Sequence, residues 1–201
     1  MSDRGRGRRG VAADRPASRH NAARRCVARR VSYPCGVADL SISASSRLAY
    51  AQGYLALGLA REARRELAAL PREERRGLPV RKLLVECAMG LKQWAQVVRL
   101  ARPITREDAG YENAWIALAF ALREMNQIRE AREALLEALP HHQFSSGVLQ
   151  YNLACYECLL GNLAEARRRL VRASKLDGSW EKVARSDPDL KALFAAGGTA
   201  T

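Results

Sequence analysis

Cys155 and Cys158 form a Cys-x-x-Cys pair, which is the spacing of redox-active thiols and of half a zinc site. A redox pair of this kind usually begins a helix after a strand, whereas the residues around this pair have the pattern of a helix interior. The sequence contains no second Cys-x-x-Cys or Cys-x-x-His to complete four zinc ligands. We therefore interpret both cysteines as small apolar side chains, buried or lining a groove, and keep thiol or metal chemistry as an alternative.

The other residues with catalytic potential do not form a recognisable pattern. His141 and His142 are adjacent, so their side chains point in different directions, and the His-Glu-x-x-His pattern of zinc proteases is absent. The Gly-x-x-x-x-Gly-Lys string of phosphate-binding loops and the Gly-x-Ser-x-Gly string of nucleophile elbows are also absent. Glutamates such as Glu62 and Glu130 fit solvated helix faces with arginine neighbours. The sequence thus predicts no enzyme, no cofactor and no metal.

Composition indicates which elements position these residues. The 201 residues are 48% hydrophobic, 27% charged and only 6% aromatic, and they are rich in the helix formers Ala, Leu, Arg and Glu. No apolar run approaches the ~20 residues that cross a bilayer, and the first residues lack the apolar stretch of a secretory signal. Five cysteines without a disulfide pattern favour a reducing compartment. We expect a soluble, helical, cytoplasmic protein.

From about Ser45 onward, a unit of about 34 residues recurs four times. A large apolar residue precedes a turn in the middle of each unit, at successive steps of 34, 34 and 35 residues: Leu57, Leu91, Met125 and Leu160. Apolar residues within each unit repeat at three- and four-residue intervals, which predicts two amphipathic helices per unit. One helix pair cannot cover its own apolar stripe, so the pairs are expected to stack into a solenoid.

Two further positions of the repeat have mechanical roles. The turn between the two helices needs a residue in the left-handed conformation, which Gly and Asn reach readily and Lys reaches at a cost: Gly58, Lys92, Asn126 and Gly161. Five residues later the second helix carries a small or slender residue that permits close approach to the first helix: Ala63, Val97, Ala131 and Ala166.

These features resemble the tetratricopeptide repeat (TPR) family. A Glu-Ala pair precedes the core of the second helix in three units, at Glu62-Ala63, Glu130-Ala131 and Glu165-Ala166. The second unit departs from the pattern and carries Pro103, which is expected to end or kink its second helix. The resemblance implies an all-α, right-handed α-solenoid of about four TPR helix–turn–helix repeats with a C-terminal capping helix pair.

The C-terminal segment, from about Val148 to Phe194, resembles the TPR end-of-group domain that closes some bacterial TPR arrays. In this interpretation Ser179 caps one short helix, and Asp187 followed by Pro188 begins another. The cap is then expected to cover the exposed stripe of the fourth repeat with three apolar side chains: Leu190, Leu193 and Phe194.

These patterns divide the chain into three parts. Residues 1–43 form a basic arm, since residues 1–46 carry ten Arg and three Asp, and we expect this arm to be disordered. Four repeats follow at 44–77, 78–111, 112–146 and 147–178, and residues 179–201 form the cap and tail. The arm is a solvated tail, a transit-like leader, a stretch translated from a start codon upstream of the real one, or a binding site for nucleic acid.

The resemblance implies a concave groove, lined by the first helix of each repeat, that binds a peptide or a partner helix. We therefore predict a non-catalytic adaptor or scaffold, with a nucleic-acid-associated protein as the alternative. For Phe120 and Tyr151, simple packing is an equal alternative. The predicted partner-binding residues come from all four repeats: Gln52, Lys82, Glu86, Asn113, Phe120, Arg123, Tyr151 and Asn152.

Overall fold

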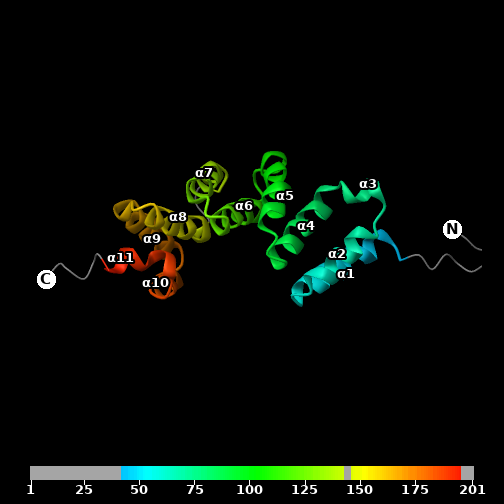
Figure 1. Ribbon diagram of the computed structural model, residues 1–201, viewed down its shortest axis with the longest axis horizontal. Helices are drawn as coiled ribbons and strands as arrows, with labels where there is room; N and C mark the ends of the chain where they lie inside the picture. Colours follow the sequence, from blue (N-terminus) through cyan, green and yellow to red (C-terminus); the bar gives the residue numbers. More distant parts are fainter. Residues whose placement is uncertain (1–41, 143–145, 196–201) are drawn as a thin grey trace, which may run out of the picture. The chain divides into compact units, whose positions relative to one another are not determined.

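The computed structural model describes residues 42–142 and 146–195, which form eleven α-helices and two 3-10 helices without a strand (Figure 1). This confirms the all-α prediction, while residues 1–41 of the predicted arm lie outside the described residues. The α-helices are α1 Ala44–Ala56, α2 Ala60–Ala68, α3 Arg72–Arg75, α4 Leu78–Gly90, α5 Trp94–Glu107, α6 Glu112–Glu124, α7 Ile128–Ala138, α8 Gly147–Leu159, α9 Leu163–Leu176, α10 Ser179–Ala184 and α11 Lys191–Ala195. The 3-10 helices are η1 Leu139–His141 and η2 Pro188–Leu190.

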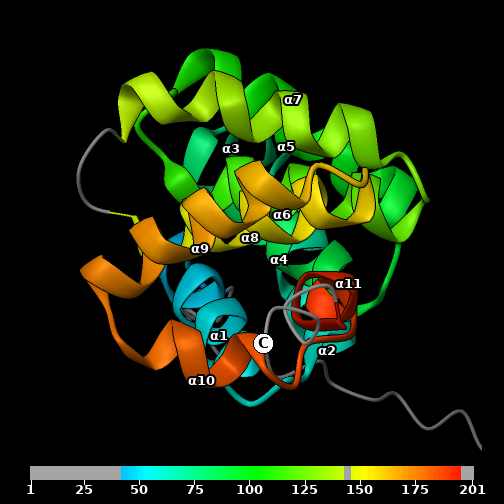
Figure 2. The ribbon, with the colours of Figure 1, turned by 90° about the vertical axis from the view of Figure 1, so that its left-hand side faces the viewer.

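The helices pack as successive antiparallel pairs in chain order. α1 packs on α2, α4 on α5, α6 on α7 and α8 on α9, and the pairs join through α2 with α4, α5 with α6 and α7 with α8. The chain therefore forms an all-α solenoid, as the repeats predicted. α3, a single turn between the first two pairs, was not predicted. α10 and α11 pack on α9 at the end of the stack (Figure 2).

Small residues of the second helices lie at the centres of these pairs. Ala63, Val97, Ala131 and Ala166 are each 0% exposed, so the backbones of paired helices approach closely at these four positions. Leu follows four residues further on in three of the four pairs, and Leu67 and Leu135 are fully buried. Burial of this stripe, at about 25 cal/mol per Å² of apolar surface, drives the stacking.

The four mid-repeat turns have the predicted left-handed residue. The φ angles are 73° at Gly58, 53° at Lys92, 61° at Asn126 and 83° at Gly161. In each turn the next backbone N–H donates to a carbonyl five residues earlier, at 2.8 or 2.9 Å, which closes the helix end. Lys reaches this conformation at a greater cost in free energy than Gly or Asn, so the second turn is strained relative to the other three.

Pro103 does not end its helix, and this part of the expectation was wrong. α5 continues four residues beyond Pro103 to Glu107. Its last turn is anchored by Ile104 and Thr105, which are 0% and 3% exposed, and the Thr105 hydroxyl donates to the carbonyl of Arg102 at 2.9 Å. Packing of this turn against α6 outweighs the backbone hydrogen bond that proline removes.

The cap agrees with the sequence interpretation in part. Ser179 does not cap α10. Ser179 is the first residue of α10, and its backbone N–H donates to the Asp177 carboxylate at 2.9 Å. Asp187 does begin η2, accepting from the Asp189 N–H at 2.9 Å. Leu190 and Leu193 are buried as expected, whereas Phe194 is 37% exposed and lines a surface hollow.

One carboxylate lies inside the stack. Glu157 on α8 is 1% exposed and accepts hydrogen bonds from the guanidinium of Arg132 on α7 and from the Asn162 amide, the latter at 2.7 Å. The charge is therefore paired and hydrogen-bonded, which is the condition under which burial of a carboxylate is tolerated. Glu157 joins the third helix pair to the turn of the fourth.

The contact between α2 and α4 yields a test of the stacking. A Cβ atom at Gly90 would lie 2.9 Å from the Ala60 Cβ, whereas a Cβ at Gly53 on α1 would meet nothing within 4 Å. We expect Gly53→Ala to raise the free energy of unfolding by about 0.5–1 kcal/mol, because alanine is the better helix former. We expect Gly90→Ala to lower it by about 1–3 kcal/mol through overpacking. Urea unfolding followed by circular dichroism measures both, and equal stabilisation by the two changes would contradict this packing.

Candidate functional site

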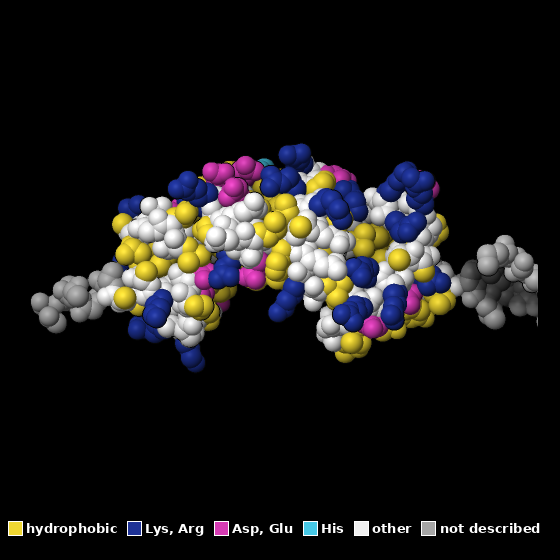
Figure 3. Space-filling view, in the orientation of Figure 1, with side chains coloured by type: hydrophobic (Ala, Val, Ile, Leu, Met, Phe, Trp, Pro, Cys, Tyr) yellow, Lys and Arg dark blue, Asp and Glu magenta, His cyan; other side chains and the backbone are white. Residues whose placement is uncertain are grey.

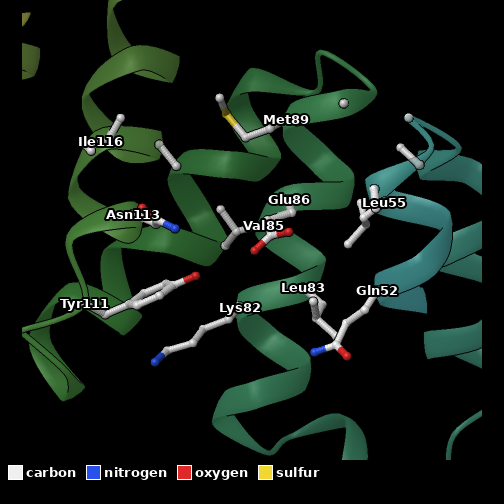
Figure 4. A pocket seen from close by; sticks show the side chains of 15 residues that line it. Gln52, Leu55, Lys82, Leu83, Val85, Glu86, Met89, Tyr111, Asn113 and Ile116 are labelled. Carbon is white, nitrogen blue, oxygen red and sulfur yellow. The ribbon is translucent and has the colours of Figure 1, made fainter. Parts of the chain in front are cut away.

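α1, α4 and α6, the first helices of three successive pairs, line a groove of about 640 Å³ that we call the open groove (Figure 4). Four of the predicted partner-binding residues lie in it: Gln52, Lys82, Glu86 and Asn113. Apolar side chains of the same three helices complete the lining, chiefly Leu55, Leu83, Val85, Met89 and Ile116. Tyr111, at the start of α6, also borders the groove and was not predicted.

Lys82 is held in place at one end of the open groove. Its ammonium lies 2.8 Å from an Asp108 carboxylate oxygen and 3.8 Å from the centre of the Tyr111 ring. The ion pair and the cation–π contact fix the side chain and offset its charge.

Glu86 on α4 and Asn113 on the neighbouring α6 both extend into the groove (Figure 4). Partial burial beside apolar neighbours raises the pKa of the Glu86 carboxyl above its ordinary value. The open groove therefore combines an apolar lining with an amide and a carboxylate that are accessible to a ligand.

The other four predicted residues lie in a different place. Phe120, Arg123, Tyr151 and Asn152 line a smaller pocket of about 240 Å³ between α6, α8 and η2. The structure therefore separates the eight predicted residues into two groups of four. That the eight residues bind a partner stays a prediction.

The chain's own cap contacts this second group, in a set of interactions that we call the cap clasp. The Arg123 guanidinium donates to both carboxylate oxygens of Asp189, with Nε to Oδ2 at 3.0 Å. The Tyr151 hydroxyl donates to Asp187 at 2.5 Å, and the Trp180 ring stacks on the Tyr151 ring with centroids 4.6 Å apart. Burial and the neighbouring Asp187 raise the pKa of Tyr151, so its hydroxyl keeps the proton that it donates.

Sequence reasoning missed both aspartates as partners of the groove. Arg123 and Asp189 are 66 residues apart, and no periodic spacing relates them. The sequence offered one signal, which is the pair of carboxylates on either side of Pro188, at Asp187 and Asp189.

The cysteines are buried and the two histidines contact neighbouring residues of the same chain. Cys87, Cys155 and Cys158 are buried, which confirms the interpretation of the Cys-x-x-Cys pair as buried side chains. In residues 42–142 and 146–195 no three His, Cys, Asp or Glu side chains are grouped to hold a metal ion. The His141 ring stacks against Trp115, and a ring nitrogen of His142 lies 3.2 Å from the Ala109 carbonyl oxygen.

Solved structures of MamA, a TPR-like protein, are similar to this chain. MamA AMB-1 has a TM-score of 0.58 at 18% identity, with 68% of this chain and 79% of that chain covered. MamA MSR-1 has a TM-score of 0.59 at 17% identity, with 69% and 79% covered. A MamA mutant has a TM-score of 0.57 at 18% identity, with 68% and 78% covered. The fold is TPR-like.

This likeness extends to the fold alone, because the identities are below 20%. A comparison with protein-family models and one with curated proteins found no match. Within the described part of this TPR-like chain, no helix is both long and apolar enough to cross a membrane.

The cap clasp predicts a measurable coupling between α6 and η2. We expect Arg123→Gln and Asp189→Asn each to lower the free energy of unfolding by about 1–3 kcal/mol, because Arg123→Gln leaves the Asp189 carboxylate without its cation and Asp189→Asn leaves Arg123 only its neighbour Glu124. A double-mutant cycle should show that the two losses are not additive. Arg185→Gln, which removes an exposed pair with Glu181, is the control and should change stability by less than about 0.5 kcal/mol. Additive losses would show that the two side chains are not coupled.

Thiol reactivity tests the burial of the cysteines. Burial raises the pKa of Cys87 to about 11 and that of Cys155 further, so both are neutral and unreactive thiols at pH 8. We expect iodoacetamide to leave Cys87, Cys155 and Cys158 unmodified in the native protein and to modify all three after denaturation, as read by peptide mass spectrometry. Because the unfolded chain releases the Cys87 proton at a lower pH than the folded protein, this thiol favours unfolding as the pH rises toward 11. Rapid native alkylation of Cys155 or Cys158 would support thiol chemistry.

Proposed function

We propose that this protein is a non-catalytic interaction scaffold that holds a segment of a partner protein in the open groove. The TPR-like fold, shared with the MamA structures, supports a role in protein interaction. The observation that carries the proposal is the groove itself, about 640 Å³ in volume and lined by three helices.

The lining of the groove matches the chemistry of a peptide chain. Leu55, Met89 and Ile116 offer apolar surface to the side chains of a partner segment. The amides of Gln52 and Asn113 each present one acceptor and two donors, which suits the N–H and C=O groups of a peptide backbone. A groove with an apolar lining and a few polar groups is the usual form of a recognition site.

The groove is also held in shape before a partner arrives. Its walls are packed helices, and the contact of Lys82 with Asp108 and Tyr111 fixes a long side chain that would otherwise lose rotamer entropy on binding. The cap already contacts Arg123 and Tyr151 in the smaller pocket beside α8. These contacts favour the open groove as the binding site over that pocket.

Two alternatives from the sequence are less well supported. Neutral, buried thiols at Cys87 and Cys155 favour binding over thiol chemistry. Nucleic-acid binding through the basic arm concerns residues outside the described ones and stays a prediction.

A displayed library of 16-residue peptides, selected on the full-length protein, tests the proposal. We expect peptides that bind in the groove to lose at least about tenfold in affinity for Ile116→Arg, which places a charge on the apolar lining, and about five- to tenfold for Asn113→Ala, which removes a backbone partner. Val183→Arg on α10 changes an exposed apolar residue outside the groove and should leave affinity unchanged. Fluorescence anisotropy measures the affinities. The proposed function would be contradicted if none of the selected peptides lost affinity for Ile116→Arg.

A further inference from the structure

A second surface, formed by α9 and α11, carries two adjoining hollows of about 390 and 400 Å³. The hollows share Arg167, Val171 and Lys175, so they form one continuous surface. We call it the basic–apolar face, and its residues used below are Arg167, Arg168, Val171, Arg172, Lys175 and Phe194. None of its residues lines the open groove.

The centre of this face is apolar and accessible. Val171 is 49% exposed and Phe194 is 37% exposed, and buried Leu170 and Leu193 form the lining beneath them. Four apolar side chains around one hollow give a site where a large apolar side chain of a partner is removed from water. The Arg167 guanidinium donates to the Leu193 carbonyl at 3.5 Å, which fastens α11 to α9 and so maintains the hollow.

The rim of the face is basic and short of carboxylates. Among the described residues, Arg167, Arg172 and Lys175 take part in no ion pair, while Arg168 shares Glu165 with Arg169. Glu181, the carboxylate lining the first hollow, is paired with Arg185 at 2.9 Å. Over the described part of the chain as a whole, Figure 3 shows Lys and Arg side chains interspersed with hydrophobic ones on the side that faces the viewer. The face therefore complements negative charge.

We propose that the basic–apolar face binds an acidic segment of a partner protein that carries a large apolar side chain. The apolar side chain packs against Val171 and Phe194, and carboxylates beside it pair with Arg172 and Lys175. This surface is separate from the open groove, so the inference does not depend on the proposed function. It gives the scaffold a second attachment point with its own charge preference.

The apolar centre favours a protein over a nucleic acid. A sugar–phosphate backbone would gain its contacts from the basic rim, and Phe194 is the one ring in the first hollow on which a base could stack, because Val171, Leu170 and Leu193 are aliphatic. An acidic protein segment with an apolar side chain uses both the rim and the centre.

The test uses the full-length protein, so that the basic arm is the same in every variant. The displayed peptide library is selected on the unchanged protein and counter-selected on Arg172→Glu/Lys175→Glu. The matched control is Arg61→Glu/Arg65→Glu on α2, which makes the same charge change at two exposed arginines away from the face. Val171→Ser removes the apolar centre without a charge change. Melting temperatures confirm that each variant is folded.

We expect the recovered peptides to be acidic and to share a large apolar residue. Their affinity should fall at least about tenfold for the α9 charge reversal and about three- to tenfold for Val171→Ser, and should stay within twofold for the α2 control. A twenty-nucleotide oligothymidine should bind the α9 and α2 reversals equally.

Four results would overturn the inference. The first is recovery of peptides without acidic character. The second is an equal loss of peptide affinity for the α9 and α2 charge reversals. The third is acidic peptides that are indifferent to Val171→Ser, which would show attraction by charge alone. The fourth is oligothymidine binding that falls tenfold only for the α9 reversal, which would assign the surface to nucleic acid.

Discussion

Each helix pair of this protein carries more apolar surface than its own two helices cover, and this excess determines how the chain folds. Small residues such as Ala63 and Ala131 bring the paired helices close together, and the remaining stripe is buried only against the next pair. Each pair is covered by the next pair along the chain, and the fourth pair is followed by the cap instead of another pair. There the cap covers the stripe with Leu190 and Leu193.

The cap that covers the fourth pair also shapes the two proposed binding surfaces. η2 contributes Asp187 and Asp189, which contact Tyr151 and Arg123 and so cover part of the face formed by the first helices. α10 and α11 pack on α9, and α11 and α9 line the hollow around Val171. One short segment therefore limits one surface and creates another. The open groove, formed by α1, α4 and α6, lies outside its contacts.

The sequence predicted features that local spacing encodes. Left-handed residues such as Lys92 and buried small residues such as Val97 recur with the repeat, and each follows from the geometry of a single helix pair. The uninterrupted helix at Pro103 was missed because tertiary packing of the following turn decides it. Arg123 and Asp189 were not paired because their contact spans 66 residues, and helical spacing carries no information over that separation.

The buried carboxylate of Glu157 affects how the helix pairs separate when the protein unfolds. Its carboxylate lies inside the stack and takes its counter-charge from Arg132 on the preceding helix pair. Loss of the Arg132 side chain alone, with the helices still packed, would leave that negative charge in a nonpolar interior with only the Asn162 amide, at a cost of about 3–5 kcal/mol. The Arg132–Glu157 ion pair therefore links the third and fourth pairs, whereas in residues 42–142 and 146–195 no buried carboxylate links the first pair to the second, so we expect local opening to begin at the α1 end.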